Sequence, residues 1–202
     1  MSIFKNLTFS FDDLDRPSFS KISSPITLQD IVNTIYNGLD GGPWIAGGMG
    51  RQMVLGETDF NDIDVWFKNP IQFEQLKARL QEKYGNTMYE TYASDNAITY
   101  NIADVKVQLI RRKWYNSLED VFKDFDFTCC QIAVDQNMQP YGPGIADAKN
   151  YKLVVNRLDT KGFLARYSKY VSYGYVMNPE DFVKVLEQEE INYEFDGSVF
   201  GY

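Results

Sequence analysis

The sequence predicts an α+β fold, in which a small mixed β-sheet is flanked by helices and continues into a helical C-terminal part. Two observations support this prediction. Strand-like and helix-like segments alternate over residues 27–135, whereas residues 151–202 show mainly helical periodicity. The chain has 202 residues, 44% of them hydrophobic, which is enough for one well-packed core or for two small cores that share an interface. We expect a single domain over residues 1–202.

Helices are expected where apolar residues recur at helical spacing and the flanking residues suit helix ends. The most regular pattern has Pro70 in its first turn and Gly85 at its end. Another follows Ser117, a residue type that caps helix N-termini. The expected helices cover residues 23–39, 49–56, 70–85, 117–125, 160–175 and 178–190.

Strands are expected where apolar and polar residues alternate, or where β-branched residues gather. The runs at residues 96–102 and 105–112 follow each other closely, so we expect them to pair. Residues 136–150 are rich in turn-forming residues and are expected to form a loop. The remaining strands or short buried segments are expected at residues 43–48, 62–67 and 127–135.

Composition narrows the possible functions. The formal net charge of −8 argues against broad, unaided adhesion to nucleic acid, because binding phosphates needs a positive surface; a local basic patch stays open. The sequence contains no histidine, which excludes Ser-His-Asp catalysis, Cys-His catalysis and histidine metal sites. Catalysis would therefore use carboxylates, Lys, Arg, Tyr or a metal ion held by oxygen ligands.

The two cysteines and the hydropathy pattern indicate a cytoplasmic protein. Cys129 and Cys130 are neighbours, a spacing that suits neither a zinc site nor a disulfide framework, and we expect reduced thiols in the core, with a reactive thiol as the alternative. No apolar run reaches about 18 residues and no charged-then-apolar leader is visible. We expect no membrane span and no membrane partner.

Asp62 and Asp64 stand two residues apart in a segment that alternates between acidic and apolar residues. In a strand, both carboxylates would leave one face of the sheet while Ile63 and Val65 enter the core. Mg²⁺ prefers hard oxygen ligands and commonly takes one or two carboxylates together with substrate phosphates. Acidic pairs at this spacing also arise by chance, so a solvated acidic turn is the alternative interpretation.

A glycine pair precedes the acidic pair. Gly47 and Gly48 follow a predicted strand and open a short helical turn, where backbone amides can approach a phosphate without a Cβ in the way. Arg51 lies one turn further along. The predicted strands on either side would bring a phosphate site next to a metal site.

These residues resemble the signature of the DNA polymerase β-like nucleotidyltransferase superfamily, in particular the head domain of the poly(A) polymerase and CCA-adding enzyme group. Residues 125–135 resemble a second segment of that group, with Asp126 and Thr128 in register, and Arg166 aligns with its nucleotide-contacting arginine. The signature residues in this sequence are Gly47, Gly48, Arg51, Leu55, Gly56, Asp62 and Asp64.

The resemblance implies a nucleotidyltransferase fold, an NTP substrate and Mg²⁺ or Mn²⁺ as cofactor. It implies that Asp62 and Asp64 are catalytic metal ligands that position and deprotonate an acceptor hydroxyl for attack on the α-phosphate. The nucleotide contacts that it implies, together with Lys169 one turn beyond Arg166, are Gly47, Gly48, Arg51, Asp126, Arg166 and Lys169.

The sequence departs from the group at three places. The strand expected to carry a third carboxylate presents Asp104, Lys106 and Gln108, so either Asp104 serves, or two carboxylates suffice, or the site is impaired. Phe125 replaces an arginine, and Phe163 stands where the group's base-reading helix has an acidic residue. Arg111, Arg112 and Lys113 are either solvated or in contact with phosphates of the substrates.

Two functions from different classes follow. The first is a metal-dependent nucleotidyltransferase that moves a nucleoside monophosphate from an NTP to a hydroxyl on RNA, protein or a small molecule and releases pyrophosphate. A small or partner-supplied acceptor is expected rather than tRNA. The alternative is a catalytically inactive protein of the same fold that binds nucleotides or proteins.

Overall fold

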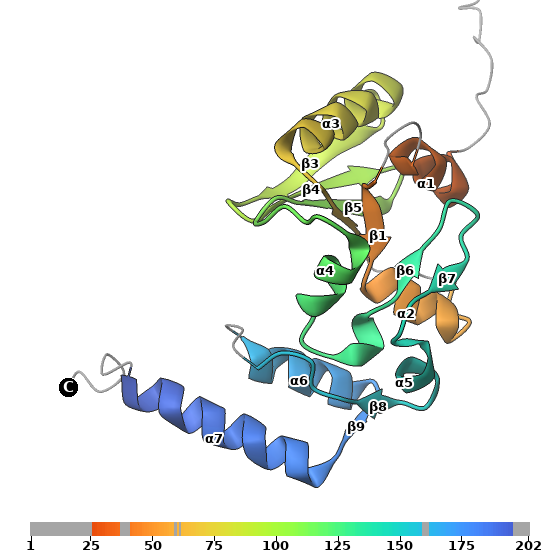
Figure 1. Cartoon of the computed structure of the whole chain (residues 1–202). Coiled ribbons are helices and arrows are strands. Elements are labelled where there is room, and N and C mark those ends of the chain that lie inside the picture. The colour runs from red at the N-terminus through yellow and green to blue at the C-terminus, as the bar shows by residue number, and fades with distance from the viewer. Residues whose placement is uncertain (1–25, 37–40, 59, 61, 159–161, 196–202) are drawn as a thin grey trace, which may run out of the picture.

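The structure is a computed structural model that describes residues 26–36, 41–58, 60, 62–158 and 162–195 (Figure 1). Helices and strands alternate along the chain up to the main sheet's last strand, and helices dominate afterwards, so the predicted α+β class is confirmed. The helices are α1 Leu28–Tyr36, α2 Gly48–Val54, α3 Pro70–Tyr84, α4 Leu118–Lys123, α5 Ile145–Lys149, α6 Phe163–Ser172 and α7 Pro179–Phe195, with a 3₁₀ turn at Thr128–Cys130.

The main sheet is mixed. Its strand order is β3-β4-β5-β2-β1-β6-β7, with β2 parallel to β5 and the other neighbours antiparallel. A small parallel sheet joins β8 to β9. The strands are β1 Trp44–Ala46, β2 Ile63–Trp66, β3 Met88–Ala93, β4 Ala97–Ile102, β5 Val105–Ile110, β6 Ala133–Val134, β7 Pro140–Tyr141, β8 Lys152–Leu153 and β9 Val176–Met177.

Local signals placed most helices correctly. Asn69 caps α3 by accepting a hydrogen bond from the Gln72 amide at 2.9 Å, and Pro70 occupies the first turn. Ser117 caps α4 through the Asp120 amide at 3.4 Å. The predicted pairing of residues 96–102 with 105–112 is confirmed as the β4–β5 hairpin.

Two segments differ from the prediction. Strand β3 was not expected, because this edge strand exposes both of its faces and has no buried alternating positions; a bulge interrupts it between Glu90 and Tyr92. The loop expected at 136–150 contains β7 and α5, whose elements are too short for a periodic pattern.

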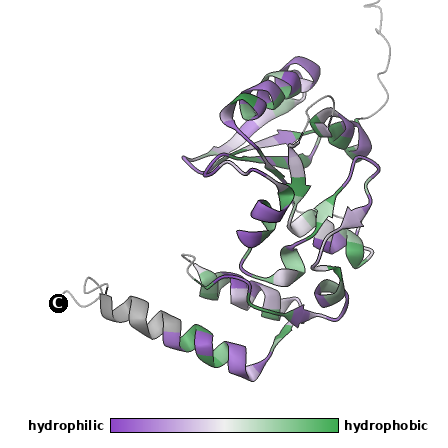
Figure 2. Cartoon of the chain, viewed as in Figure 1, coloured by the Kyte–Doolittle hydropathy of each residue, from purple (hydrophilic) through white to green (hydrophobic). Residues whose placement is uncertain are grey.

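Helices cover the two faces of the sheet unequally. On one face, α1 and α3 bury a large apolar cluster that includes Ile35, Leu76 and Val65. On the other face, α4 packs Val121 against a smaller cluster around Trp66. In Figure 2 the central strands carry hydrophobic stretches, whereas α3 alternates between hydrophobic and hydrophilic turns. The second face therefore remains partly open between the sheet, α4 and α6.

The C-terminal helices form a third cluster. Helices α6 and α7 lie side by side below the sheet in Figure 1, with Tyr167 and Phe182 stacked at 5.3 Å between ring centroids. Phe163 of α6 packs against Phe127, with 5.0 Å between their centroids. This contact fixes α6 beside the segment that follows α4. Within the described residues, no helix is long and apolar enough to cross a membrane.

Candidate functional site

A cavity of about 740 Å³ opens on the partly covered face of the sheet. We call it the central cavity. Strands β2 and β5, the turn between β1 and α2, the segment after α4 and helix α6 all contribute to it. Its lining consists of Gly47, Gly48, Asp62, Asp64, Trp66, Asn96, Ala97, Gln108, Ile110, Arg112, Asp124, Phe125, Asp126, Phe127, Cys130, Arg157, Arg166, Lys169 and Tyr170.

The acidic pair lies in this cavity. Ile63 and Val65 are fully buried in the core on the opposite face of β2, as the alternation predicts, and Asp62 and Asp64 both line the central cavity. The Oδ1 atom of Asp64 is buried and has no hydrogen-bond partner in the described part of the chain. A buried carboxylate oxygen without a partner is costly unless a ligand satisfies it.

The pKa of Asp64 reflects this environment. Burial, and then the negative charge of Asp62, raise the pKa to about 7, and the positive charges of Lys169 and Arg112 only partly oppose this. A divalent cation would offset both the burial and the repulsion between the two carboxylates. The residues fit a Mg²⁺ site that uses two carboxylates and completes its shell with water and phosphate oxygens. No cluster of three or more potential metal-ligating side chains occurs among the described residues.

The glycine turn lies directly beside Asp64. Ile45 is opposite Val65 in the antiparallel β1–β2 pair, so the residues after β1 lie beside the first residues of β2. Gly47 has φ 114° and ψ −127°, a conformation that L side chains rarely adopt. A Cβ on Gly47 would lie 3.2 Å from the Phe125 ring and 3.5 Å from the Oδ2 atom of Asp64. A Cβ on Gly48 would meet nothing within 4 Å, so there is open space next to the backbone at this point.

An amide takes the position next to Asp64 on the neighbouring strand. Gln108 is the register partner of Asp64 in the parallel β2–β5 pair, and its Nε2 atom donates to Thr99 Oγ1 at 3.1 Å. Asp104 lies in the turn between β4 and β5, where its φ is 69°, its side chain is exposed, and it does not line the central cavity. Of the alternatives left by the sequence, Asp104 is therefore not the third carboxylate.

Helix α6 supplies cations to the opposite wall. Arg166 forms an ion pair through Nε with the buried carboxylate of Asp126, and Lys169 lines the cavity one helical turn further on. Phe163 is buried in the core and is absent from the lining. Asp126 and Arg166, named by the resemblance, and Lys169, named by its spacing from Arg166, thus meet in the cavity, whereas Phe163 does not line it.

Asp124 gathers a second group of cations that the sequence did not point to as a unit. Its carboxylate accepts from Arg112 at 3.2 Å, Lys113 at 3.3 Å, Arg157 at 2.8 Å and the hydroxyl of Tyr115. Burial alone would raise the pKa of Asp124, but the hydrogen bonds from Tyr115 and Lys113 and the charge of Arg112 lower it below its usual value. Three of its partners lie 9 to 12 positions before Asp124 and Arg157 lies 33 positions after it, spacings that carry no local signal.

Comparison with known proteins identifies the family. The profile of the Gabija anti-defense 2 family matches residues 18–144, more than half of the chain. The chain belongs to the Gabija anti-defense 2 family. One relative, "Gabija anti-defense 2" of Bacillus phage SPbetaL7, is 22% identical over 147 residues, which are 70% of this chain and 36% of that protein. The chain thus spans about a third of the relative's length.

Solved structures with a similar fold include CCA-adding enzymes. The enzyme of Bacillus stearothermophilus in complex with CTP gives a TM-score of 0.56 at 17% identity, covering 75% of this chain and 40% of that one. The Thermotoga maritima enzyme complexed with tRNA gives 0.57 at 13% identity, covering 74% and 38%. A CCA-adding enzyme in an apo form gives 0.59 at 13% identity, covering 82% and 42%. This Gabija anti-defense 2 family member therefore has the nucleotidyltransferase fold that the signature predicts.

Arg51 departs from the prediction that it contacts the nucleotide, because it does not line the central cavity. Its side chain is 5% exposed and points into a group of tyrosine rings, with its Cζ atom 5.7 Å from Tyr170, 5.3 Å from Tyr173 and 5.8 Å from Tyr175. A guanidinium at such distances is stabilised by the electron-rich ring faces. In this family member Arg51 joins α2 to the C-terminal part.

The cysteines match the expectation for core thiols. Cys129 and Cys130 are both free and buried. The sulfur of Cys130 lies 2.8 Å from the hydroxyl of Tyr170, and both residues line the central cavity. Their position ties the segment after α4 to α6.

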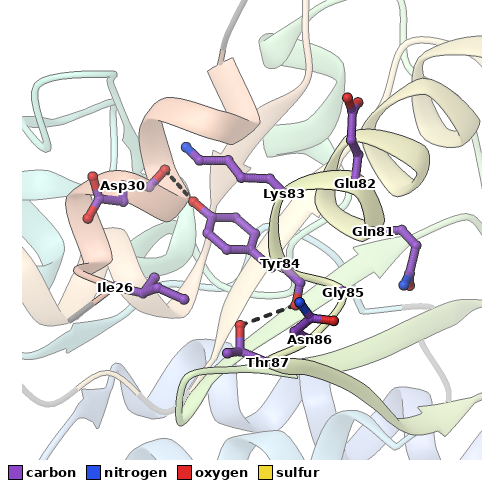
Figure 3. A pocket seen from close by; sticks show the side chains of 9 residues that line it. All are labelled: Ile26, Asp30, Gln81, Glu82, Lys83, Tyr84, Gly85, Asn86 and Thr87. Atoms are coloured by element: carbon purple, nitrogen blue, oxygen red, sulfur yellow. Dashed lines mark hydrogen bonds between the residues drawn. The ribbon is translucent and has the colours of Figure 1, made fainter. Parts of the chain in front are cut away.

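A second cavity of about 590 Å³ lies between α1 and the C-terminal end of α3 (Figure 3). None of the predicted site residues lines it. Tyr84 donates from its hydroxyl to the Asp30 carbonyl at 2.9 Å, and Thr87 donates to the Tyr84 carbonyl at 3.1 Å. The first bond joins α1 to the end of α3, and the second closes the turn after α3, so the cavity lies where two packed helices meet.

Proposed function

We propose that this protein is a metal-dependent nucleotidyltransferase that moves a nucleoside monophosphate from an NTP to a hydroxyl group and releases pyrophosphate. One observation carries the proposal: the partnerless carboxylate oxygen of Asp64 lies with Asp62 beside the glycine turn in a cavity of about 740 Å³. That volume lies within the range of about 300–1,000 Å³ typical of small-molecule sites. The fold shared with CCA-adding enzymes supports the same function.

Residues on different walls of the central cavity have different proposed roles. Asp62 and Asp64 would hold a divalent cation, which supplies charge stabilisation for the phosphoryl oxygens. The open space at Gly48 admits phosphate close to the backbone, and Arg166 and Lys169 orient the nucleotide from α6. The acceptor oxygen forms a bond to the α-phosphorus, the bond to the bridging oxygen of the β-phosphate breaks, and pyrophosphate leaves. The hydroxyl proton passes to the carboxylate pair. Catalysis is then mainly positioning and electrostatics.

The side chains of α6 that face the central cavity determine which bases the site can distinguish. Because Phe163 is buried, α6 offers Arg166 and Lys169 to the substrate but no acidic reader of a Watson–Crick edge. We therefore propose weak discrimination among the four NTPs. The family name points to an acceptor in an antiviral defence system, and an RNA end or a protein hydroxyl both suit the proposed chemistry.

A catalytically inactive nucleotide-binding module is the second candidate. Gln108 favours it, because an amide stands next to Asp64 in place of a further carboxylate. Such a protein would bind NTP in the central cavity without breaking a phosphoanhydride bond.

Labelled NTPs separate the two candidates. The purified protein is incubated with each NTP and Mg²⁺ or Mn²⁺, with RNA, with proteins of the bacterial host, or alone, and pyrophosphate release and label transfer are measured. If the protein is a transferase, the wild type should release pyrophosphate and transfer the label. Asp62→Asn and Asp64→Asn should do neither. Asp104→Asn is the matched control, since it removes an exposed carboxylate outside the cavity. NTP binding without pyrophosphate release under every condition would contradict the transferase and support the module.

A further inference from the structure

Three cations gather around Asp124, and two of them lie in the wall of the central cavity. Arg112 and Arg157 line the cavity and lie 3.2 Å and 2.8 Å from the carboxylate of Asp124. Lys113 joins the same carboxylate at 3.3 Å. We call these four residues the Asp124 cluster. It stands out in a chain whose formal net charge is −8.

The cluster holds more positive than negative charge. Arg112 and Lys113 alone exceed the single charge of Asp124 by one, even when Arg157 is left out of the count. Asp124 is buried, and the side chain of Arg112 is 38% exposed. A structural ion pair needs only one cation for each carboxylate, whereas an excess of cations at a cavity wall is the arrangement that binds an anion.

The cluster also lies close to the acidic pair. The Cζ atom of Arg112 is 5.5 Å from the centre of the Trp66 ring, which holds the guanidinium over the cavity. Trp66 follows Asp64 by two positions on the same face of β2, a step of about 7 Å along a strand. Arg112 and Asp64 thus line the same cavity, and the charge of Arg112 acts on the carboxylate of Asp64.

The neighbouring arginine shows that this placement is selective. Arg111 donates from Nε at 3.1 Å and from Nη2 at 2.7 Å to the Ser94 carbonyl, and it does not line the cavity. Two adjacent arginines thus have different surroundings: Arg111 fastens the end of β5, and Arg112 faces the cavity.

We propose that Arg112 and Arg157, held on Asp124, form a phosphate-binding subsite of the central cavity. The planar guanidinium groups suit the oxygens of a phosphate, and Asp124 fixes their orientation in advance. The phosphate belongs either to the polyphosphate chain of an NTP or to a phosphodiester of the acceptor. The inference deepens the proposed function and rests on it for this choice of substrates.

Binding of inorganic tripolyphosphate without metal, followed by calorimetry, tests the subsite. We expect the wild-type protein to bind it and Arg112→Gln to weaken binding about tenfold or more, the effect of losing one charged hydrogen bond. Arg111→Gln removes the same charge one residue away and is expected to bind like the wild type. Arg157→Gln is the second test if Arg112→Gln does not fold. No binding by the wild type, or wild-type affinity in both Arg112→Gln and Arg157→Gln, would overturn the proposal.

Competition identifies the source of the phosphate. Displacement of tripolyphosphate by ATP assigns the subsite to the NTP, and displacement by a 3′-blocked RNA oligonucleotide but not by ATP assigns it to the acceptor. Displacement by neither would place the anion elsewhere and overturn the proposal. The same titration in the Asp62→Asn, Asp64→Asn double variant should retain binding. If no assay detects transfer of the nucleotide while tripolyphosphate binding persists, the proposed function is contradicted and the subsite is not.

Discussion

The carboxylate of Asp64 faces Gly47 across the β1–β2 pair, with its Oδ2 atom 3.5 Å from the place where a Cβ on Gly47 would stand. This contact joins the two features that the sequence displays separately, the glycine pair and the acidic pair. The φ of 114° and the Phe125 ring 3.2 Å from the same point disfavour a side chain on this glycine, and the carboxylate lies next to the open backbone at Gly48. The chemistry proposed for the central cavity depends on this proximity.

Alanine at the two glycines should have different effects. Gly47→Ala forces a Cβ into a backbone with φ 114° and against Phe125, so we expect a loss of about 1–3 kcal/mol in the free energy of unfolding. Gly48→Ala has no such clash and should leave the stability close to that of the wild type, while its Cβ takes up space that the phosphate would occupy and weakens NTP binding. Urea unfolding and NTP titration measure the two effects. Equal stability losses in both variants would contradict the prediction.

The stability of the metal-free protein should fall as the pH rises. The pKa of Asp64 is about 7 in the folded state, against about 3.9 in an unfolded chain, so the folded state binds the proton more tightly. This contribution to stability is fully present below about pH 4 and is lost as the pH rises through about 7. Its limiting slope is about 1.4 kcal/mol per pH unit.

Urea unfolding at a series of pH values tests this dependence. Asp64→Asn should remove it, Asp104→Asn should keep it, and Mg²⁺ should restore stability above about pH 7, because the cation binds the ionised carboxylate. A pH dependence that is the same in Asp64→Asn and the wild type would assign the effect to another group.

Arg51 should matter for stability and not for nucleotide affinity. Arg51→Met keeps much of the side-chain length but loses the interaction with the tyrosine rings, worth about 2 kcal/mol when desolvated. Lys152→Met, at an exposed position of β8, is the control for removing a positive charge. Thermal unfolding and NTP titration are compared for both. A weaker NTP affinity with unchanged stability would return Arg51 to the nucleotide-binding role that the resemblance implies.

Arg166 should contribute to both properties. Arg166→Ala takes a charged donor from the buried carboxylate of Asp126, which we expect to lower the free energy of unfolding by about 1–3 kcal/mol. It also removes a cation from the cavity wall and should weaken NTP binding about tenfold. Arg166→Lys retains the charge and should recover part of the affinity. Unchanged NTP affinity in Arg166→Ala would show that the ion pair is only structural.

The parts of the site that the sequence predicted are those encoded by local patterns. Alternation along β2 separates Asp62 and Asp64 from Ile63 and Val65, because successive side chains in a strand point to opposite faces. The turn at Gly47 and Gly48 was predicted from residue type, because glycine adopts backbone conformations that other residues avoid. Asp126 and Arg166 were named by the resemblance and Lys169 by its helical spacing from Arg166, and the structure brings the three residues into the same cavity.

The parts that escaped prediction depend on contacts between distant segments. Arg51 was expected near phosphate, but its direction is set by tyrosines more than a hundred residues further along the chain. The pairing of Arg157 with Asp124 joins residues 33 positions apart and has no local signal. Asp104 has the right charge and was expected on the strand, but it lies in the turn before β5 and outside the cavity.

The structure of the protein with Mg²⁺ and a non-hydrolysable NTP analogue tests the central claim most directly. We predict a metal ion about 2.0–2.1 Å from carboxylate oxygens of Asp62 and Asp64, with the triphosphate beside the backbone of Gly48. A nucleotide bound outside the central cavity, or a triphosphate whose metal ion contacts neither aspartate, would contradict the account.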